Sequence, residues 1–156
     1  MKTKNPVTEI KIREIMTKNV ETVSPVDSIK DAVNLMMDSK LTTVPVINGD
    51  FQCIGILSRS DLTEMFLQED SELSQALDTD LIALKWLQQS LDTSEVRQVK
   101  ELMTYDVTTI RADQSLMEAC KEMSRLGVHH LPVVDDRDTV VGIVSAFDIV
   151  AAIARV

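Results

Sequence analysis

Two stretches of the chain carry apolar residues at the spacing of one helix face. In residues 29–36 and again in residues 116–123, apolar side chains fall at positions i, i+3, i+4 and i+7, which places them on one side of an α-helix. A serine precedes each stretch (Ser28 and Ser115), and an acidic residue follows that serine three positions later. This pattern is typical of a helix N-terminus, so both stretches are predicted to be helices. Their apolar residues are Ile29, Ala32, Val33 and Met36 in the first and Leu116, Ala119, Cys120 and Met123 in the second.

Each of these helices is followed by a predicted β-hairpin and a further helix. Runs of apolar and β-branched residues that flank turn residues are typical of hairpins, and Asn48-Gly49-Asp50 supplies the turn in the first of them. A short extended stretch precedes each first helix and ends at Thr22-Val23 or at Thr109-Ile110. The hairpin strands are predicted at 44–47 with 53–57 and at 131–134 with 140–144, and the last helices near 60–67 and 147–155. Each unit therefore consists of strand, helix, strand, strand and helix.

The two units are copies of one sequence repeat. Glu14-Ile15-Met16-Thr17 returns as Glu101-Leu102-Met103-Thr104, and Val44-Pro45-Val46 returns as Leu131-Pro132-Val133, in each case 87 residues later. The same offset holds without a gap over residues 10–69. A copy of about 60 residues has a thin core by itself. We therefore predict an α/β (α+β) fold in which two β-α-β-β-α units form a pseudo-twofold pair with a cleft between the copies.

The segment between the copies differs in kind from both of them. Residues 68–96 hold seven acidic residues and one lysine, and they contain neither glycine nor proline. Five leucines of this segment lie on one helical stripe, which predicts an amphipathic helix over residues 71–91. The stripe either packs on its own domain or forms a dimer contact, a partner contact or a lid. The predicted domains are a first repeat at 8–67, an acidic helical insert at 68–96 and a second repeat at 97–156.

Charge and composition narrow the class of protein. The 156 residues include 16 basic and 25 acidic ones, a formal net charge of −9, and only 3% of the residues are aromatic. Both observations argue against binding to nucleic acid. No apolar run approaches the ~18 residues that a membrane span requires, and the first residues carry no apolar core of a signal peptide. With only two cysteines, Cys53 and Cys120, the expected compartment is the reducing cytoplasm.

A Ser-x-x-Asp motif follows the second hairpin strand of each copy, at Ser58 with Asp61 and at Ser145 with Asp148. In one interpretation the serine and the aspartate cap the following helix. In the other, the free N–H groups of the helix N-terminus form an anion site, and the aspartate accepts hydrogen bonds from a ribose diol. A glycine three residues before each serine would let the backbone come close to such a ligand.

The two histidines, His129 and His130, are the other candidates for ligand binding. Because neighbouring residues of an extended run point to opposite faces, they are not expected to share a metal ion. One of them should face the cleft, where an N–H donor or a positive charge could meet a phosphate. The same positions of the first copy hold Thr42 and Thr43, so the two clefts should differ in affinity for anions. No metal-ligand spacing, nucleophile motif or general-base pair is present, and neither a metal site nor enzymatic activity is expected.

These motifs resemble the tandem cystathionine-β-synthase (CBS) domains known as the Bateman module. The resemblance covers residues 10–67 and 97–156, and it rests on Ile15-Met16-Thr17, on Val44-Pro45-Val46 and on the run from Gly55 to Asp61, each with its second copy. It implies two β-α-β-β-α units and the regulatory binding of an adenosyl ligand such as AMP, ADP, ATP or S-adenosylmethionine. It also implies association into disc-like dimers.

The resemblance implies a role for each residue that matches the family motif. The ribose-binding aspartate of the family is matched by Asp61 and Asp148. The hydroxyl that faces ribose or phosphate is matched by Ser58 and Ser145. A second small hydroxyl is matched by Ser60, and Phe147 replaces it in the second copy. The strand whose backbone recognises adenine is matched by Thr22, Val23, Thr109 and Ile110. The second wall of the adenine site is matched by Val44, Pro45, Leu131 and Pro132. His129 and His130 lie where the family often has a His-Arg pair near phosphate, and the missing arginine argues against strong triphosphate binding.

The sequence therefore predicts a regulatory CBS-pair protein that binds an adenosyl nucleotide and signals in trans, through a homodimer or a protein partner. The alternative hypothesis is an interaction module with empty clefts that acts through the acidic insert. The two differ in a simple observation, since only the first predicts that an adenosyl nucleotide stabilises the protein.

Overall fold

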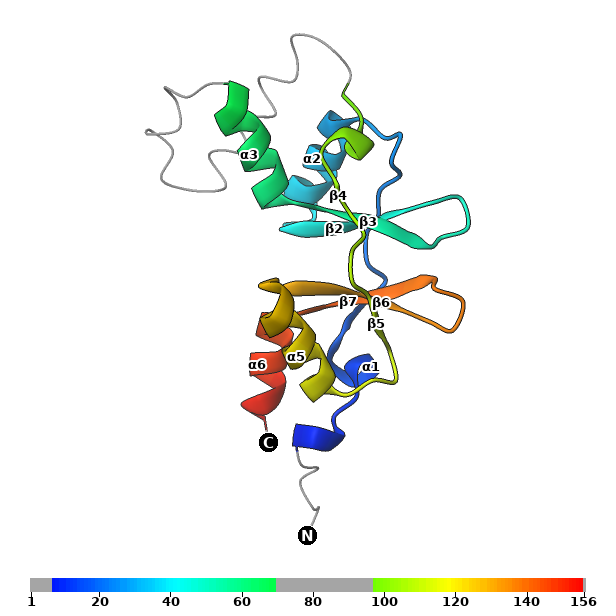
Figure 1. Ribbon diagram of the computed structural model, residues 1–156, viewed down its shortest axis with the longest axis vertical. Coiled ribbons are helices and arrows are strands. Elements are labelled where there is room, and N and C mark those ends of the chain that lie inside the picture. Colours follow the sequence, from blue (N-terminus) through cyan, green and yellow to red (C-terminus); the bar gives the residue numbers. More distant parts are fainter. Residues whose placement is uncertain (1–6, 70–96, 156) are drawn as a thin grey trace. The chain divides into compact units, whose positions relative to one another are not determined.

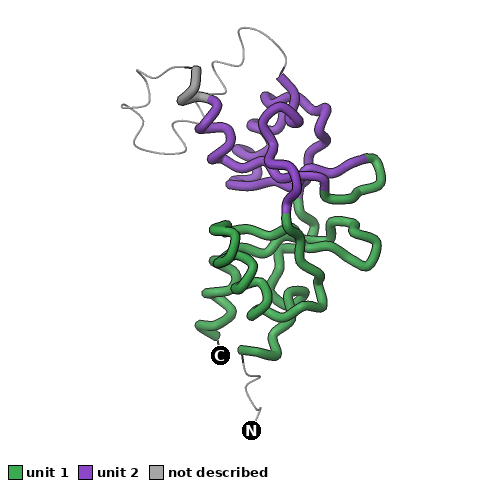
Figure 2. Tube along the Cα trace, viewed as in Figure 1, with its two compact units in different colours: residues 1–20, 49–53, 108–156 green, residues 21–48, 54–107 purple. Residues whose placement is uncertain are grey.

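The computed structural model describes residues 7–69 and 97–155. Within them the chain forms two compact units, and each unit combines segments from both halves of the sequence (Figure 2). Unit 1 takes residues 7–20, 49–53 and 108–155, and unit 2 takes residues 21–48, 54–69 and 97–107. The helix predicted over residues 71–91 lies outside the described residues.

Unit 1 is a four-stranded sheet with helices packed on it (Figure 1). The strand order is β1-β7-β6-β5, in which β6 and β7 form the predicted antiparallel hairpin and β5 runs parallel to β6. Helices α5 and α6 contact each other and the hairpin strands. The elements are η1 (Val7–Glu9), α1 (Ile12–Ile15), β1 (Thr17–Lys18), β5 (Ile110–Arg111), α5 (Leu116–Leu126), β6 (His130–Val134), β7 (Val140–Ser145) and α6 (Ala146–Ile153).

Unit 2 repeats this plan with a three-stranded sheet of order β2-β3-β4. The extended stretch that was predicted to end at Val23 is present as a single parallel bridge from Val23 to Val46, where unit 1 has the short strand β5. Its elements are α2 (Ile29–Asp38), β2 (Thr43–Ile47), β3 (Cys53–Ser58), α3 (Arg59–Glu69), η3 (Val99–Glu101) and β4 (Thr104–Tyr105). The two sheets and their helices confirm the predicted mixed fold of two related units.

The first residues of each repeat pack on the other repeat. We call residues 11–18 leading segment 1 and residues 98–105 leading segment 2. The Ile12 N–H donates to the carbonyl of Gln114 at 2.9 Å, and 87 residues later the Val99 N–H donates to the carbonyl of Asp27 at the same distance. Strand β1 pairs with β7, and β4 pairs with β3. The repeats have therefore exchanged their leading segments.

Each core is completed by the exchanged segment. Ile12, from leading segment 1, is fully buried among the residues of the second repeat. Val99 and Met103, from leading segment 2, are buried among those of the first repeat. Because apolar burial is the main favourable term in folding, neither repeat has its complete core without residues of the other.

The predicted helix N-termini are confirmed. The Ser115 hydroxyl accepts from the Glu118 N–H at 3.3 Å, and the Ser115 N–H donates to the Glu118 carboxylate at 2.7 Å. Chiefly because of that backbone hydrogen bond, the pKa of Glu118 is lowered to about 2. At α2, Ser28 accepts from the Asp31 N–H at 3.0 Å.

None of the helices in the described part of the chain has the length and apolar character of a membrane span.

Candidate functional site

Ser145 and Asp148 form a closed capping box where β7 passes into α6. Ser145 is the last residue of the strand, its backbone is extended, and its hydroxyl accepts from the Asp148 N–H at 3.1 Å. In return, the Ser145 N–H and hydroxyl donate to Oδ2 of Asp148 at 2.8 and 2.6 Å. Within the described part of the chain, Oδ1 of Asp148 accepts no hydrogen bond. One oxygen of this half-buried carboxylate is thus held and the other is open to a donor.

Ser58 and Asp61 repeat this box in unit 2, with one addition. The Ser58 N–H and hydroxyl donate to Oδ2 of Asp61 at 2.7 and 2.6 Å. Oδ1, however, accepts from the hydroxyl of Thr104 at 3.2 Å, a residue 43 positions away in leading segment 2. The capping interpretation is therefore confirmed in both units, and the binding of a ribose stays a prediction. Sequence reasoning missed Thr104 because no local pattern relates it to Asp61.

The two glycines before these boxes make room for the chain itself. The sequence suggested that Gly55 and Gly142 let a ligand approach, and this interpretation is wrong. A Cβ at Gly142 would lie 2.7 Å from the carbonyl oxygen of Thr17, and a Cβ at Gly55 would lie 2.8 Å from that of Thr104. The leading segments fill the space that the missing side chains leave, since β1 pairs with β7 at Gly142 and β4 pairs with β3 at Gly55.

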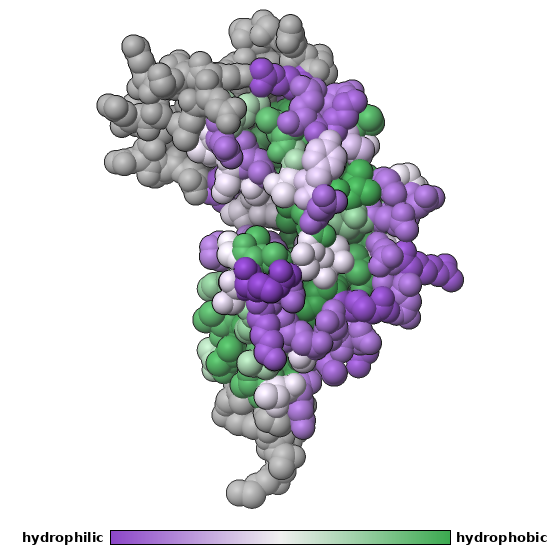
Figure 3. Space-filling view, in the orientation of Figure 1, coloured by the Kyte–Doolittle hydropathy of each residue, from purple (hydrophilic) through white to green (hydrophobic). Residues whose placement is uncertain are grey.

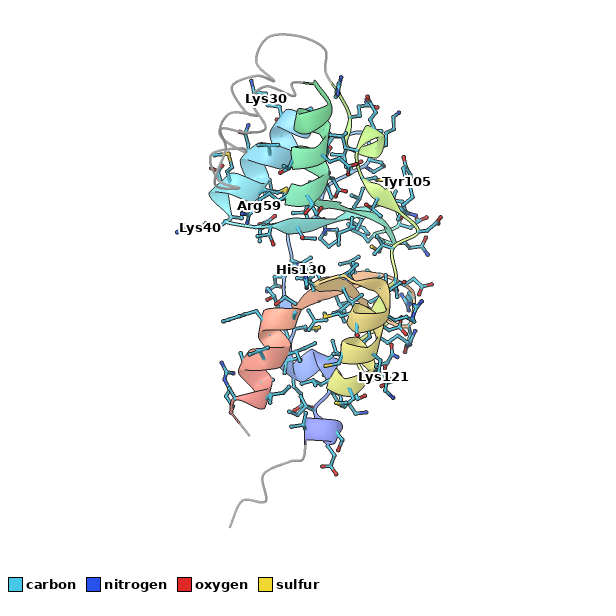
Figure 4. The ribbon with its side chains drawn as sticks, turned by 60° about the vertical axis from the view of Figure 1, so that its left-hand side comes forward. Lys30, Lys40, Arg59, Tyr105, Lys121 and His130 are labelled. Atoms are coloured by element: carbon cyan, nitrogen blue, oxygen red, sulfur yellow. The ribbon has the colours of Figure 1, made fainter. Side chains whose placement is uncertain are left out.

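The two histidines lie beside the box of unit 1. His130 is half-buried and is paired with Ser145 across the hairpin, while His129 is exposed and its carbonyl accepts from the Ala146 N–H at 2.8 Å. Burial lowers the pKa of His130, the neighbouring His129 lowers it further, and Asp148 acts in the opposite direction. The imidazole of His130, labelled in Figure 4, is therefore mainly uncharged at neutral pH and offers a donor or an acceptor more readily than a positive charge.

Most of the residues predicted to contact adenine are buried in the hydrophobic cores of the two units. Val23 and Val44 are buried in the core of unit 2, and Ile110 and Leu131 in that of unit 1. Val23 also has both main-chain groups bonded to β2, through the carbonyl of Pro45 at 3.1 Å and the N–H of Ile47 at 2.9 Å. These side chains, and the main-chain groups of Val23, are therefore already engaged within the units. The remaining predicted positions are Pro45 and Pro132, both buried, Thr22 and Thr109, both half-buried, and Ser60, which is exposed in the first turn of α3.

Two further observations concern the kinds of site that are present. Among the residues that the structure describes, no group of three His, Cys, Asp or Glu side chains is placed to hold a metal ion. Cys53 and Cys120 are both partly buried, and neither forms a disulfide within the described residues.

The repeated motifs have a direct counterpart among known proteins. Residues 12–68 and residues 99–155 each match the model of the CBS domain. The chain belongs to the CBS domain family. As a CBS-pair protein it is similar to an uncharacterized protein of Methanocaldococcus jannaschii, with 29% identity over 91% of this chain and 90% of that protein. It is also 28% identical to the inosine-5′-monophosphate dehydrogenase of the same organism, over 89% of this chain but only 23% of the enzyme.

Solved structures of CBS pairs show the same fold. The CBS-pair protein CBSX2 from Arabidopsis thaliana is 26% identical, with a TM-score of 0.72 and coverage of 95% of this chain and 96% of CBSX2. A second structure, of CBSX2 in complex with AMP, matches at 25% identity with a TM-score of 0.71, over 94% of this chain and 97% of CBSX2. The CBS pair of protein MJ0100, in complex with 5′-methylthioadenosine and S-adenosyl-L-methionine, matches at 22% identity with a TM-score of 0.71, over 92% of this chain and 98% of that one, and shows the fold alone.

Proposed function

We propose that this CBS-pair protein is a regulatory protein that binds an adenosyl nucleotide and passes the signal on in trans. The observation that carries the proposal is the carboxylate of Asp148, whose Oδ2 is held by two donors of Ser145 while Oδ1 is open. An acceptor that is fixed in place and still free to accept is what recognition of a ribose hydroxyl requires. The AMP complex of the similar CBSX2 supports the same ligand class.

The proposed ligand is AMP or S-adenosylmethionine rather than ATP. The uncharged His130 lies near Asp148, and the corresponding position of unit 2 holds Thr43. A triphosphate needs several positive charges or a metal ion close by, and neither residue supplies a charge. Binding in a cleft between the repeats and the contacts with adenine at Thr22 and Thr109 belong to the same proposal.

Replacing Asp148 by asparagine should weaken AMP binding at the site of unit 1 about tenfold or more. Asparagine keeps one oxygen for Ser145, but its amide group is a donor and cannot accept from a ribose hydroxyl; a hydrogen bond to a charged group contributes about 1.5–3 kcal/mol. Titration calorimetry with AMP, ADP, ATP, S-adenosylmethionine and GMP on ligand-free protein measures the affinities. Asp113→Asn, which removes an exposed charge of the same unit, should leave them unchanged.

The site assignment would be wrong if Asp61→Asn and Asp148→Asn together left the affinity unchanged. A saturating nucleotide at 100 times its dissociation constant should also raise the stability of the wild-type protein by about 2.7 kcal/mol. If no adenosyl compound changed the melting temperature, the alternative hypothesis of an interaction module would be favoured over the sensor.

We propose that the protein forms a homodimer through a contact made by α6, and that this homodimer transmits the effect of ligand binding. Three apolar side chains of this helix are well exposed: Phe147 at 78%, Val150 at 61% and Ile153 at 46%. Their spacing of three residues places them along one side of the helix, and apolar residues gather on this part of unit 1 in Figure 3. The first two corresponding positions of α3 hold Ser60 and Thr63. A contiguous exposed apolar surface is typical of an interaction site.

Phe147→Ser combined with Val150→Ser should weaken self-association at least tenfold, because buried aromatic residues dominate interface energies. Sedimentation velocity over a range of protein concentrations measures the change. The control variant Val26→Ser removes an apolar side chain of unit 2 that is as exposed as Val150, at 61%. It should leave the self-association unchanged. A wild-type protein that stays monomeric at high concentration would contradict the homodimer.

A further inference from the structure

We propose that Thr104 makes the two ribose sites unequal. The site of unit 2 accepts a hydrogen bond from one ribose hydroxyl, and the site of unit 1 accepts hydrogen bonds from two. The inference rests on the proposed function and deepens it. We assign the remaining position of Asp61 to the 3′ hydroxyl, so the Asp61 site should accept 2′-deoxyadenosine nucleotides nearly as well as adenosine nucleotides. The Asp148 site should discriminate between them.

The difference follows from the number of acceptor positions on each carboxylate. An ionised carboxylate has about four, two on each oxygen. In both units two donors of the capping serine occupy Oδ2. Oδ1 of Asp148 keeps both of its positions for the two hydroxyls of a ribose. Oδ1 of Asp61 already accepts from the Thr104 hydroxyl at 3.2 Å, which leaves one position.

The difference between the two sites comes from the leading segments, because the Ser-x-x-Asp motif is the same in both repeats. Thr17 stands 87 residues before Thr104 and pairs with β7 in the same register as Thr104 pairs with β3, yet no hydrogen bond joins Thr17 to Asp148 in the described chain. The residue after Thr104 is Tyr105, labelled in Figure 4, whose hydroxyl donates to the carbonyl of Lys100 at 2.6 Å. The corresponding residue of leading segment 1 is Lys18. Among the described residues, strand β4 thus has a hydrogen bond within its own segment that β1 lacks.

Two single variants isolate the two sites for the test. Asp61→Asn leaves the site of unit 1, and Asp148→Asn leaves that of unit 2. Titration calorimetry with AMP and with 2′-deoxy-AMP gives the ratio of their dissociation constants for each variant. We expect a ratio of about tenfold, ~1.4 kcal/mol, for Asp61→Asn and of less than about twofold for Asp148→Asn.

Removal of the Thr104 hydroxyl should then restore discrimination at unit 2. Adding Thr104→Val to Asp148→Asn should raise the ratio to about tenfold, while Thr104→Ser, which keeps the hydroxyl, should leave it below twofold. The matched control is Thr17→Val added to Asp61→Asn, for which no change is expected. A change in stability alone would alter both nucleotides' affinities together and would not move their ratio.

Each outcome distinguishes this inference from the proposed function. Equal ratios for Asp61→Asn and Asp148→Asn, or a ratio that Thr104→Val does not raise, would overturn the role of Thr104 while AMP binding stands. If the wild-type protein bound neither of these nucleotides nor S-adenosylmethionine, the proposed function itself would fail.

Discussion

Ile12→Ala should lower the free energy of unfolding by about 3 kcal/mol and should loosen unit 1 rather than the repeat in which Ile12 lies in the sequence. The side chain is fully buried among residues of the second repeat, and truncation of a buried isoleucine typically costs about 2–5 kcal/mol. Urea denaturation measures the stability. Hydrogen exchange followed by mass spectrometry locates the loss of protection, which is expected in α5 and in the β6–β7 hairpin.

The matched variant is Val99→Ala, 87 residues later. Val99 is fully buried in the core of unit 2, so its truncation should cost about 2 kcal/mol and should raise exchange in α2 and in the β2–β3 hairpin. If instead Ile12→Ala exposed α2 and Val99→Ala exposed α5, the leading segments would not be exchanged in solution.

Gly142→Ala should lower the free energy of unfolding by about 2 kcal/mol. The new Cβ would lie 2.7 Å from the Thr17 carbonyl oxygen and 2.8 Å from Sδ of Met16, so either β1 moves away from β7 or the strands are strained. Overpacking of this kind typically costs about 1–3 kcal/mol. Thermal and urea denaturation check the value, and Gly55→Ala should behave in the same way because the Thr104 carbonyl lies 2.8 Å from its Cβ position.

Gly49→Ala is the control for the glycine substitution as such. No heavy atom lies within 4 Å of its Cβ position, so its effect should stay within about 0.5 kcal/mol. If Gly142→Ala were as well tolerated as Gly49→Ala, the close approach of Met16 and Thr17 to β7 would be contradicted, because these two residues supply the atoms nearest to the Cβ position of Gly142.

Local features of this protein could be read from the sequence. The helices after Ser28 and Ser115 and the boxes at Ser58 and Ser145 were predictable because a cap depends on residues three positions apart. The hairpins were predictable from their turn residues. The repeat, with its constant offset of 87 residues, showed that the same unit occurs twice, and its motifs indicated the family.

The exchange of the leading segments was decided only by the tertiary structure. Their backbone hydrogen bonds, such as that from Ile12 to Gln114, form between groups that every residue carries, and two copies of one motif present nearly equal partners to either segment. The sequence by itself therefore could not say which repeat a leading segment joins.

The sequence alone determined which residues cap, turn and repeat, since these properties depend on neighbours along the chain. The tertiary structure decided what Gly142 makes room for and that the hydroxyl of Thr104 reaches Asp61 across 43 positions. Both depend on strands that meet only after folding, and the register of that meeting is set by packing of the whole unit rather than by any local pattern.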